Sequence, residues 1–208
     1  TATLTIGREL NGKFIGSITI PSSNGFDLAI TSFADIAITN NLIIIPEESP
    51  LTEKLFIIKL PSEKYPFVSY NNTIRTDYLG NIINNSDNAL TNNAVITENY
   101  YIEFAATKAG RYSAAHAQNI HFNTENIIGN HNTTENIMVI VYTQTNQPLI
   151  NIPVSINVSG NGTLNNNTST GNIIYTHAAI SENAVISAAF ENITATLSVQ
   201  TYIDDVKP

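Results

Sequence analysis

The sequence predicts an all-β protein built from β-sandwiches, and three observations support this fold class. Apolar and polar residues alternate over short runs, which is the pattern of strands with one buried and one solvated face. Asn-Gly and Gly-Asn pairs, which favour tight turns, separate many of these runs. Helix is scarce, because the best helical stretch, residues 114–119, is long enough for only a turn or two. Frequent turns between strands of five to eight residues are typical of a β-sandwich.

Strict alternation is clearest in Thr1–Ile6, Val154–Ser159 and Ile193–Gln200. In the first run the apolar positions are Ala2, Leu4 and Ile6. Continuous apolar runs at Leu42–Ile45 and Leu55–Leu60 predict central strands that are buried on both faces. Prolines follow both runs, as expected at the ends of strands.

The composition excludes several classes of protein. Charged residues make up 12% of the chain, about half the share usual in soluble domains, while Asn, Thr and Ser number 29, 24 and 15. The net charge of −8 and the lack of basic clusters argue against a nucleic-acid partner. No apolar stretch approaches the length of a membrane span. The absence of cysteine excludes disulfides and thiol chemistry.

The sequence begins at Thr1 and not at methionine, which suggests an exported protein whose signal peptide has been removed. We therefore expect an extracellular or cell-surface location. An uncharged polar surface suits such a location, because amides and hydroxyls hardly change their charge with pH.

One short motif resembles the E–F corner of immunoglobulin-like domains. The segment Ala-Gly-Arg-Tyr-Ser-Ala, residues 109–114, places Tyr112 two residues before Ala114, where antibody domains carry their second cysteine. The resemblance implies a tyrosine corner, in which the hydroxyl of Tyr112 hydrogen-bonds back to the backbone and fixes the turn.

The carboxy-terminal part, Ile137–Tyr202, resembles the bacterial Ig-like repeats of invasin- and intimin-type surface proteins. The residues that carry this resemblance are Val139–Pro148, Ile152–Val158, Gly171–His177 and Ala184–Ala188. The family commonly has a charged Asp-x-x-Gly-Asn turn where this chain has residues 143–147, so the match concerns the strand pattern. Such domains act as rigid spacers or adhesive modules without catalytic residues.

The sequence therefore predicts two Ig-like β-sandwich domains in tandem, preceded by an alternating strand. Residues 119–135 are polar, Asn-rich and nearly free of alternation, so we expect the domain boundary near residue 130. The expected parts are a donor-type strand over residues 1–7, a sandwich over 8–130 and an invasin-type sandwich over 135–203. Residues 70–93 are the expected loop insertion of the first sandwich.

Eight Asn-x-Ser/Thr sequons are candidates for N-glycosylation, slightly more than chance placement would produce. Two of the asparagines fall on the polar positions of alternating strands and should face water. The eight are Asn71, Asn84, Asn132, Asn157, Asn161, Asn166, Asn167 and Asn192.

No group of residues predicts catalysis or metal binding. His116 and His121 are five residues apart, which fits neither the zinc-binding His-Glu-x-x-His helix nor a pair on neighbouring strands. The adjacent acids Glu47 and Glu48 would diverge in an extended chain and are poor acid–base partners. We expect no enzyme activity, no metal and no cofactor.

Two functions remain open. Thr1–Ile6 could leave its own domain and fill a groove in the next copy, with Ala2, Leu4 and Ile6 buried there and Ile18 and Ile20, or the Ile-rich strands after residue 36, lining the groove. Each copy would then give and receive one strand in a head-to-tail homopolymer. In its composition and terminal strand the chain resembles subunits of archaeal surface threads.

The same strand could instead belong to its own sandwich. The alternative function is a cell-surface adhesin that binds a host receptor or a glycan, as the resemblance to invasin-type repeats implies.

Overall fold

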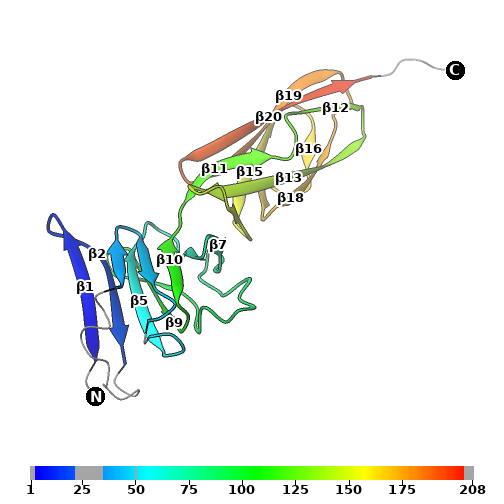
Figure 1. The fold of residues 1–208 in the computed structure, drawn as a ribbon. Coiled ribbons are helices and arrows are strands. Elements are labelled where there is room, and N and C mark those ends of the chain that lie inside the picture. The colour runs from blue at the N-terminus through cyan, green and yellow to red at the C-terminus, as the bar shows by residue number, and fades with distance from the viewer. Residues whose placement is uncertain (1–2, 22–34, 50, 204–208) are drawn as a thin grey trace. The chain divides into compact units, whose positions relative to one another are not determined.

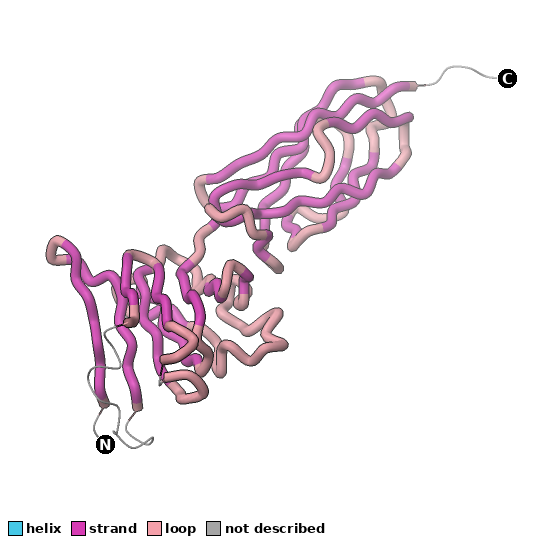
Figure 2. The backbone as a smooth tube through the Cα atoms, viewed as in Figure 1, coloured by secondary structure: helices cyan, strands magenta, loops and turns pink. Residues whose placement is uncertain are grey.

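The computed structural model describes residues 3–21, 35–49 and 51–203 (Figure 1). The chain divides into two compact units, Thr1–His116 and Ala117–Pro208. All regular structure within the described residues is β-strand, as Figure 2 shows. The all-β prediction is confirmed.

The first unit is a sandwich of two five-stranded sheets, ordered β1-β2-β5-β9-β8 and β3-β4-β10-β6-β7. The strands of the first sheet are β1 Leu4–Leu10, β2 Lys13–Ile20, β5 Phe56–Pro61, β8 Val95–Thr97 and β9 Tyr101–Ala106. Those of the second are β3 Ala37–Thr39, β4 Leu42–Ile45, β6 Val68–Tyr70, β7 Thr73–Ile74 and β10 Gly110–Ala114.

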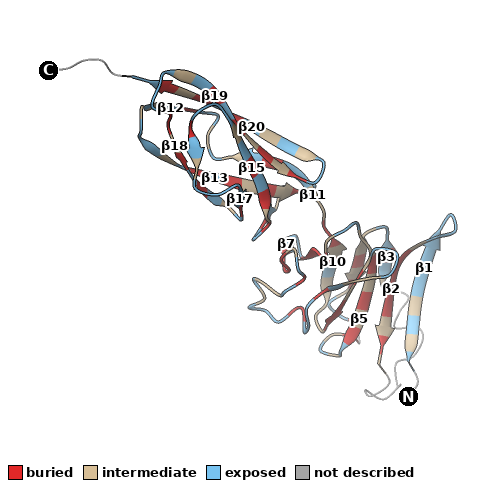
Figure 3. Cartoon of the chain, turned by 180° about the vertical axis from the view of Figure 1, so that it is seen from behind, coloured by how far each residue is buried: buried red, intermediate tan, exposed pale blue. Residues whose placement is uncertain are grey.

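The apolar runs of the first unit form central strands, but only one face of each is fully buried. Along β5, Phe56, Ile58 and Leu60 are buried in the core, while the residues between them are partly exposed. The strand β4 alternates in the same way. Figure 3 shows this buried band along β5 and β2 and its absence from β1. The prediction of burial on both faces is therefore wrong, because a two-layer sandwich leaves one side of each sheet to solvent.

The loop insertion expected over residues 70–93 begins at the end of β6 and includes the short strand β7. No strand is described between Ile74 and Val95, yet polar contacts fix this segment. The guanidinium of Arg75 is buried, forms an ion pair with Asp87 at 2.8 Å and donates to the Asn84 carbonyl. The segment is thus a loop held by an internal ion pair and hydrogen bonds.

The second unit is also a sandwich of two sheets, ordered β11-β13-β18-β16, with β14 paired to β13, and β12-β20-β19-β15-β17. The strands of the first are β11 Ala117–Phe122, β13 Thr134–Thr143, β14 Pro148–Leu149, β16 Thr163–Leu164 and β18 Asn172–Thr176. Those of the second are β12 Asn126–Asn130, β15 Val154–Ser159, β17 Thr168–Ser169, β19 Glu182–Phe190 and β20 Ile193–Tyr202.

The predicted linker differs from the structure. Residues 119–135 contain most of β11 and all of β12, and the units separate between His116 and Ala117, not near residue 130. β11 pairs antiparallel with β13, and β12 pairs parallel with β20. Both are edge strands, which need few apolar residues, and Ile120 and Ile127 supply the side chains that each one buries.

Candidate assembly interface

The first strand, β1, lies at the edge of its sheet and contains two of the three proposed donor residues. Its register with β2 runs from Leu4 opposite Ile20 to Leu10 opposite Lys13. Among the described residues β1 pairs with no other strand. The third proposed donor residue, Ala2, lies outside the described residues. In this single chain the strand thus completes its own sheet, as the alternative interpretation of the segment expects.

At the start of β1, over Leu4–Ile6, the side chains alternate between the core and solvent, as the sequence predicts, whereas Gly7–Leu10 are all exposed. Leu4 and Ile6 are half-buried and pack against the core of the first unit. They stand opposite Ile20 and Ile18 of β2, which are buried, and Thr5 between them is exposed. Leu4 and Ile6 therefore lie beside the two isoleucines proposed to line the acceptor groove.

Among the described residues β1 pairs only with β2, and beyond that ladder Leu4 and Ile6 pack against the core. The turn to β2 consists of Asn11 and Gly12, both with positive φ, 51° and 73°. These values suit the tight turn that an Asn-Gly pair favours. Arg8 adds one tether by donating from Nη1 to the Ile38 carbonyl of β3 at 3.0 Å. A strand with one ladder and a two-residue hinge has the construction from which strand exchange starts.

Tyr112 forms the hydrogen bond that defines a tyrosine corner. Its side chain is fully buried on β10, and its hydroxyl donates to the carbonyl of Lys108, four residues upstream, at 2.7 Å. The rings of Phe56, Tyr70 and Phe104 surround it, with centroids 6.1, 4.8 and 5.8 Å away. Burial raises the pKa of Tyr112, so the hydroxyl stays a neutral donor.

All eight sequon asparagines are exposed. Asn157 lies within β15, and Asn192 lies in the turn between β19 and β20, next to the strand expected from the sequence. At Asn161 the atom that would carry a glycan, Nδ2, donates to Glu182 at 2.8 Å.

Glu182 accepts hydrogen bonds from the Asn161 side chain and from the backbone N–H groups of Asn161 and Gly162. The bond from the Asn161 side chain is the main cause of the lowered pKa of the Glu182 carboxyl. Sequence reasoning missed this contact, because the partners are 21 positions apart and no local motif joins them.

The histidines make separate structural contacts. His177 is buried, with Nδ1 at 2.8 Å from the Thr201 hydroxyl, and burial lowers its pKa. His121 packs edge-on against Tyr142, and His131 contacts the Asn130 side chain. Within the described parts of the chain, no three His, Asp or Glu side chains gather as metal ligands would. No helix there is long and apolar enough to cross a membrane.

Both units are Ig-like β-sandwiches. No protein-family model matches the chain, and no curated protein matches it. Among solved structures it is similar to domains 4 and 5 of the surface-layer protein SbsC, with 8% identity over 65% of this chain and 98% of that one and a TM-score of 0.39. The intimin D0–D1 domains give 12% identity over 72% and 90% of the two chains, with a TM-score of 0.32. A titin Z1Z2 tandem gives 11% identity, the same coverages and a TM-score of 0.29.

Proposed function

We propose that this protein is a non-catalytic structural subunit of an extracellular filament, assembled head-to-tail by exchange of β1 between copies and N-glycosylated on its surface. The observation that supports this most is the construction of β1. It is an edge strand with one ladder and a two-residue hinge, and its apolar side chains Leu4 and Ile6 pack against the core.

When β1 leaves its own sheet it would expose a groove beside β2, and β1 of the next copy would fill that groove. Leu4 and Ile6 would again meet Ile20 and Ile18, now across two chains, so the joint restores the packing that each subunit gives up. The remaining cost is the entropy of association, which high local concentration reduces.

In the proposed filament each copy gives β1 to the next copy and receives β1 from the previous one, so the exchange propagates and does not close. Each copy uses β1 to give and the edge of β2 to receive, and these are different surfaces, so the interface is heterologous. A surface poor in charge and rich in Asn, Thr and Ser, with exposed sequons, fits an extracellular polymer whose properties should vary little with pH.

Deletion of Thr1–Gly7 tests the proposal on the full chain. It removes Leu4 and Ile6, so the variant should be secreted as folded monomers that form no filaments in electron micrographs. A sharper pair keeps the length of the strand. Ile6→Asn should abolish filaments because it puts an amide into the groove, whereas Thr5→Asn changes an exposed position of the same strand and should leave them intact.

Normal filaments from both the deletion and Ile6→Asn would rule out exchange of β1. The adhesin function would replace this proposal if monomers of either variant, and monomers of the wild type, bound cells or glycans saturably. Intact-mass measurement on native protein tests glycosylation separately, since an unmodified mass of 22.6 kDa would exclude it.

A further inference from the structure

The outward face of the sheet β12-β20-β19-β15-β17 is a continuous array of side chains that the assembly proposal does not use. Strand register arranges these side chains in four rows across the sheet. The rows are Thr168–Ser155–Ala189–Thr194, Asn157–Ser187–Thr196, Ser159–Val185–Ser198–Asn126 and Asn183–Gln200–Ile128.

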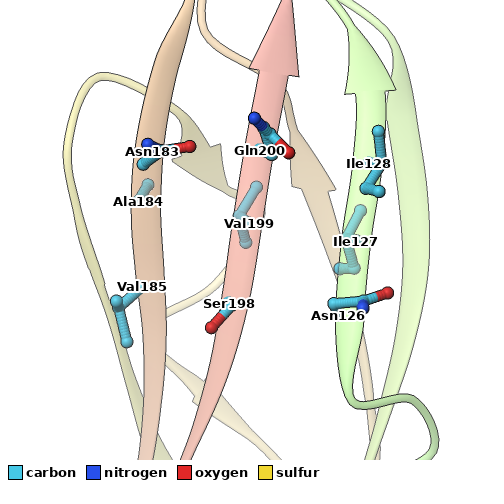
Figure 4. A pocket seen from close by; sticks show the side chains of 9 residues that line it. All are labelled: Asn126, Ile127, Ile128, Asn183, Ala184, Val185, Ser198, Val199 and Gln200. Atoms are coloured by element: carbon cyan, nitrogen blue, oxygen red, sulfur yellow. The ribbon is translucent and has the colours of Figure 1, made fainter.

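No charged side chain occurs in these four rows. Most of the side chains are hydroxyls and amides, and the few apolar ones are small or aliphatic. The third and fourth rows form a shallow hollow of about 380 Å³ around Ser198, shown in Figure 4 between the side chains of Asn126, Asn183 and Gln200. Hydroxyls and amides that both donate and accept hydrogen bonds match a neutral, polyhydroxylated ligand.

The second row contains the sequon asparagine Asn157, whose serine, Ser159, lies in the third row. Asn157 stands opposite Ser187, which stands opposite Thr196. A glycan on Asn157 would therefore start at the β15 end of the second row, next to the third row that contains its serine. With strands ~4.8 Å apart and rows ~6.8 Å apart, the array measures roughly 14 by 20 Å, which accommodates several sugar residues.

We propose that the N-linked glycan of Asn157 folds back onto this array and covers the outward face of the sheet. This inference rests on the glycosylation included in the proposed function, but not on strand exchange. The array has no aromatic side chain in its four rows to stack on a sugar ring, so it would hold a free saccharide poorly. A glycan tethered at Asn157 is present at an effective concentration of roughly millimolar or higher, so weak hydrogen bonds suffice.

Hydroxyl-radical footprinting with mass spectrometry tests the proposal on the native glycoprotein, both as filaments and as monomers. The reporter is Val185, which is 38% exposed in the bare chain and lies diagonally next to Asn157. Met138 and Ile174, 40% and 41% exposed on the other sheet of the unit, are internal controls. The variant is Asn157→Gln, and Ser86→Ala, which removes the Asn84 sequon in the first unit, is its matched control.

We expect Val185 to be oxidised several-fold faster in Asn157→Gln than in the wild type or in Ser86→Ala, with Met138 and Ile174 unchanged in all three. Absence of a glycan from Asn157 in the peptide map would overturn the inference. Equal oxidation of Val185 with the glycan present would overturn it as well, because the glycan would then extend into solvent. If Val185 in Asn157→Gln were protected in filaments but not in monomers, a second copy would cover the face. Electron micrographs of the same samples report strand exchange independently.

Discussion

Replacement of Tyr112 by phenylalanine should destabilise the first unit because it removes the hydrogen-bonding hydroxyl of a buried side chain. The substitution keeps the ring and its packing against Phe56, Tyr70 and Phe104. The shorter of its hydrogen bonds, 2.7 Å from the hydroxyl to the carbonyl of Lys108, disappears. The Lys108 carbonyl then lacks this donor next to the fully buried ring of residue 112. Loss of one partner of a buried hydrogen bond typically costs about 1–3 kcal/mol.

Urea unfolding of the monomeric protein, followed by far-UV circular dichroism and by amide hydrogen exchange in β10, measures this cost. With a denaturant slope of roughly 2 kcal/mol/M, a loss of about 2 kcal/mol lowers the midpoint of the first unit by about 1 M. Tyr142→Phe is the control, because Tyr142 is partly exposed on β13 of the second unit. Equal midpoints of the first unit in the Tyr112→Phe and Tyr142→Phe proteins would refute the assignment of a stabilising corner.

Three further substitutions test the second unit. The pKa of His177 is lowered in the fold, whereas in the unfolded chain the imidazole takes up a proton below pH about 6.5. Stability should therefore fall as the pH drops from 6.5 towards the folded pKa, by at most about 1.4 kcal/mol per pH unit, and His177→Gln should flatten urea midpoints measured from pH 7.5 to 5. Gly162→Ala places a Cβ 2.0 Å from the Tyr175 hydroxyl oxygen and should cost about 1–3 kcal/mol in thermal unfolding, whereas a neutral result would mean that the ring moves freely. Thr143→Val removes the side-chain acceptor of two backbone N–H groups in the following turn and should cost about 1–2 kcal/mol, and unchanged amide exchange in that turn would contradict this.

The sequence predicts strands well where one face is regularly apolar. Val154–Ser159 is β15 to the residue, and in Ile193–Gln200 Leu197 and Val199 are buried while the threonines at 194 and 196 are exposed. The prediction failed at β11 and β12, because an edge strand can be held by backbone pairing and one or two buried side chains. Local alternation is then too weak to distinguish such a strand from a linker.

The candidate sites were predictable in part. The β1 segment and the sequons follow from the sequence, since alternation and the Asn-x-Ser/Thr pattern are local. The row that joins Asn157 to Ser187 and Thr196 depends on the register between distant strands, which no local pattern encodes. The contact between Glu182 and Asn161 could not be predicted from the sequence for the same reason.

A disulfide trap across β1 and β2 tests the central claim most directly, because the chain contains no cysteine. Thr5 and Thr19 are paired residues whose hydroxyl oxygens are 2.9 Å apart, so Thr5→Cys with Thr19→Cys places two thiols within bonding reach. In oxidised filaments we predict disulfides between successive subunits, seen as a ladder on denaturing gels that collapses on reduction, with no ladder from either single variant. Oxidised filaments of the double variant that run as single chains, with the disulfide mapped within one chain, would contradict strand exchange.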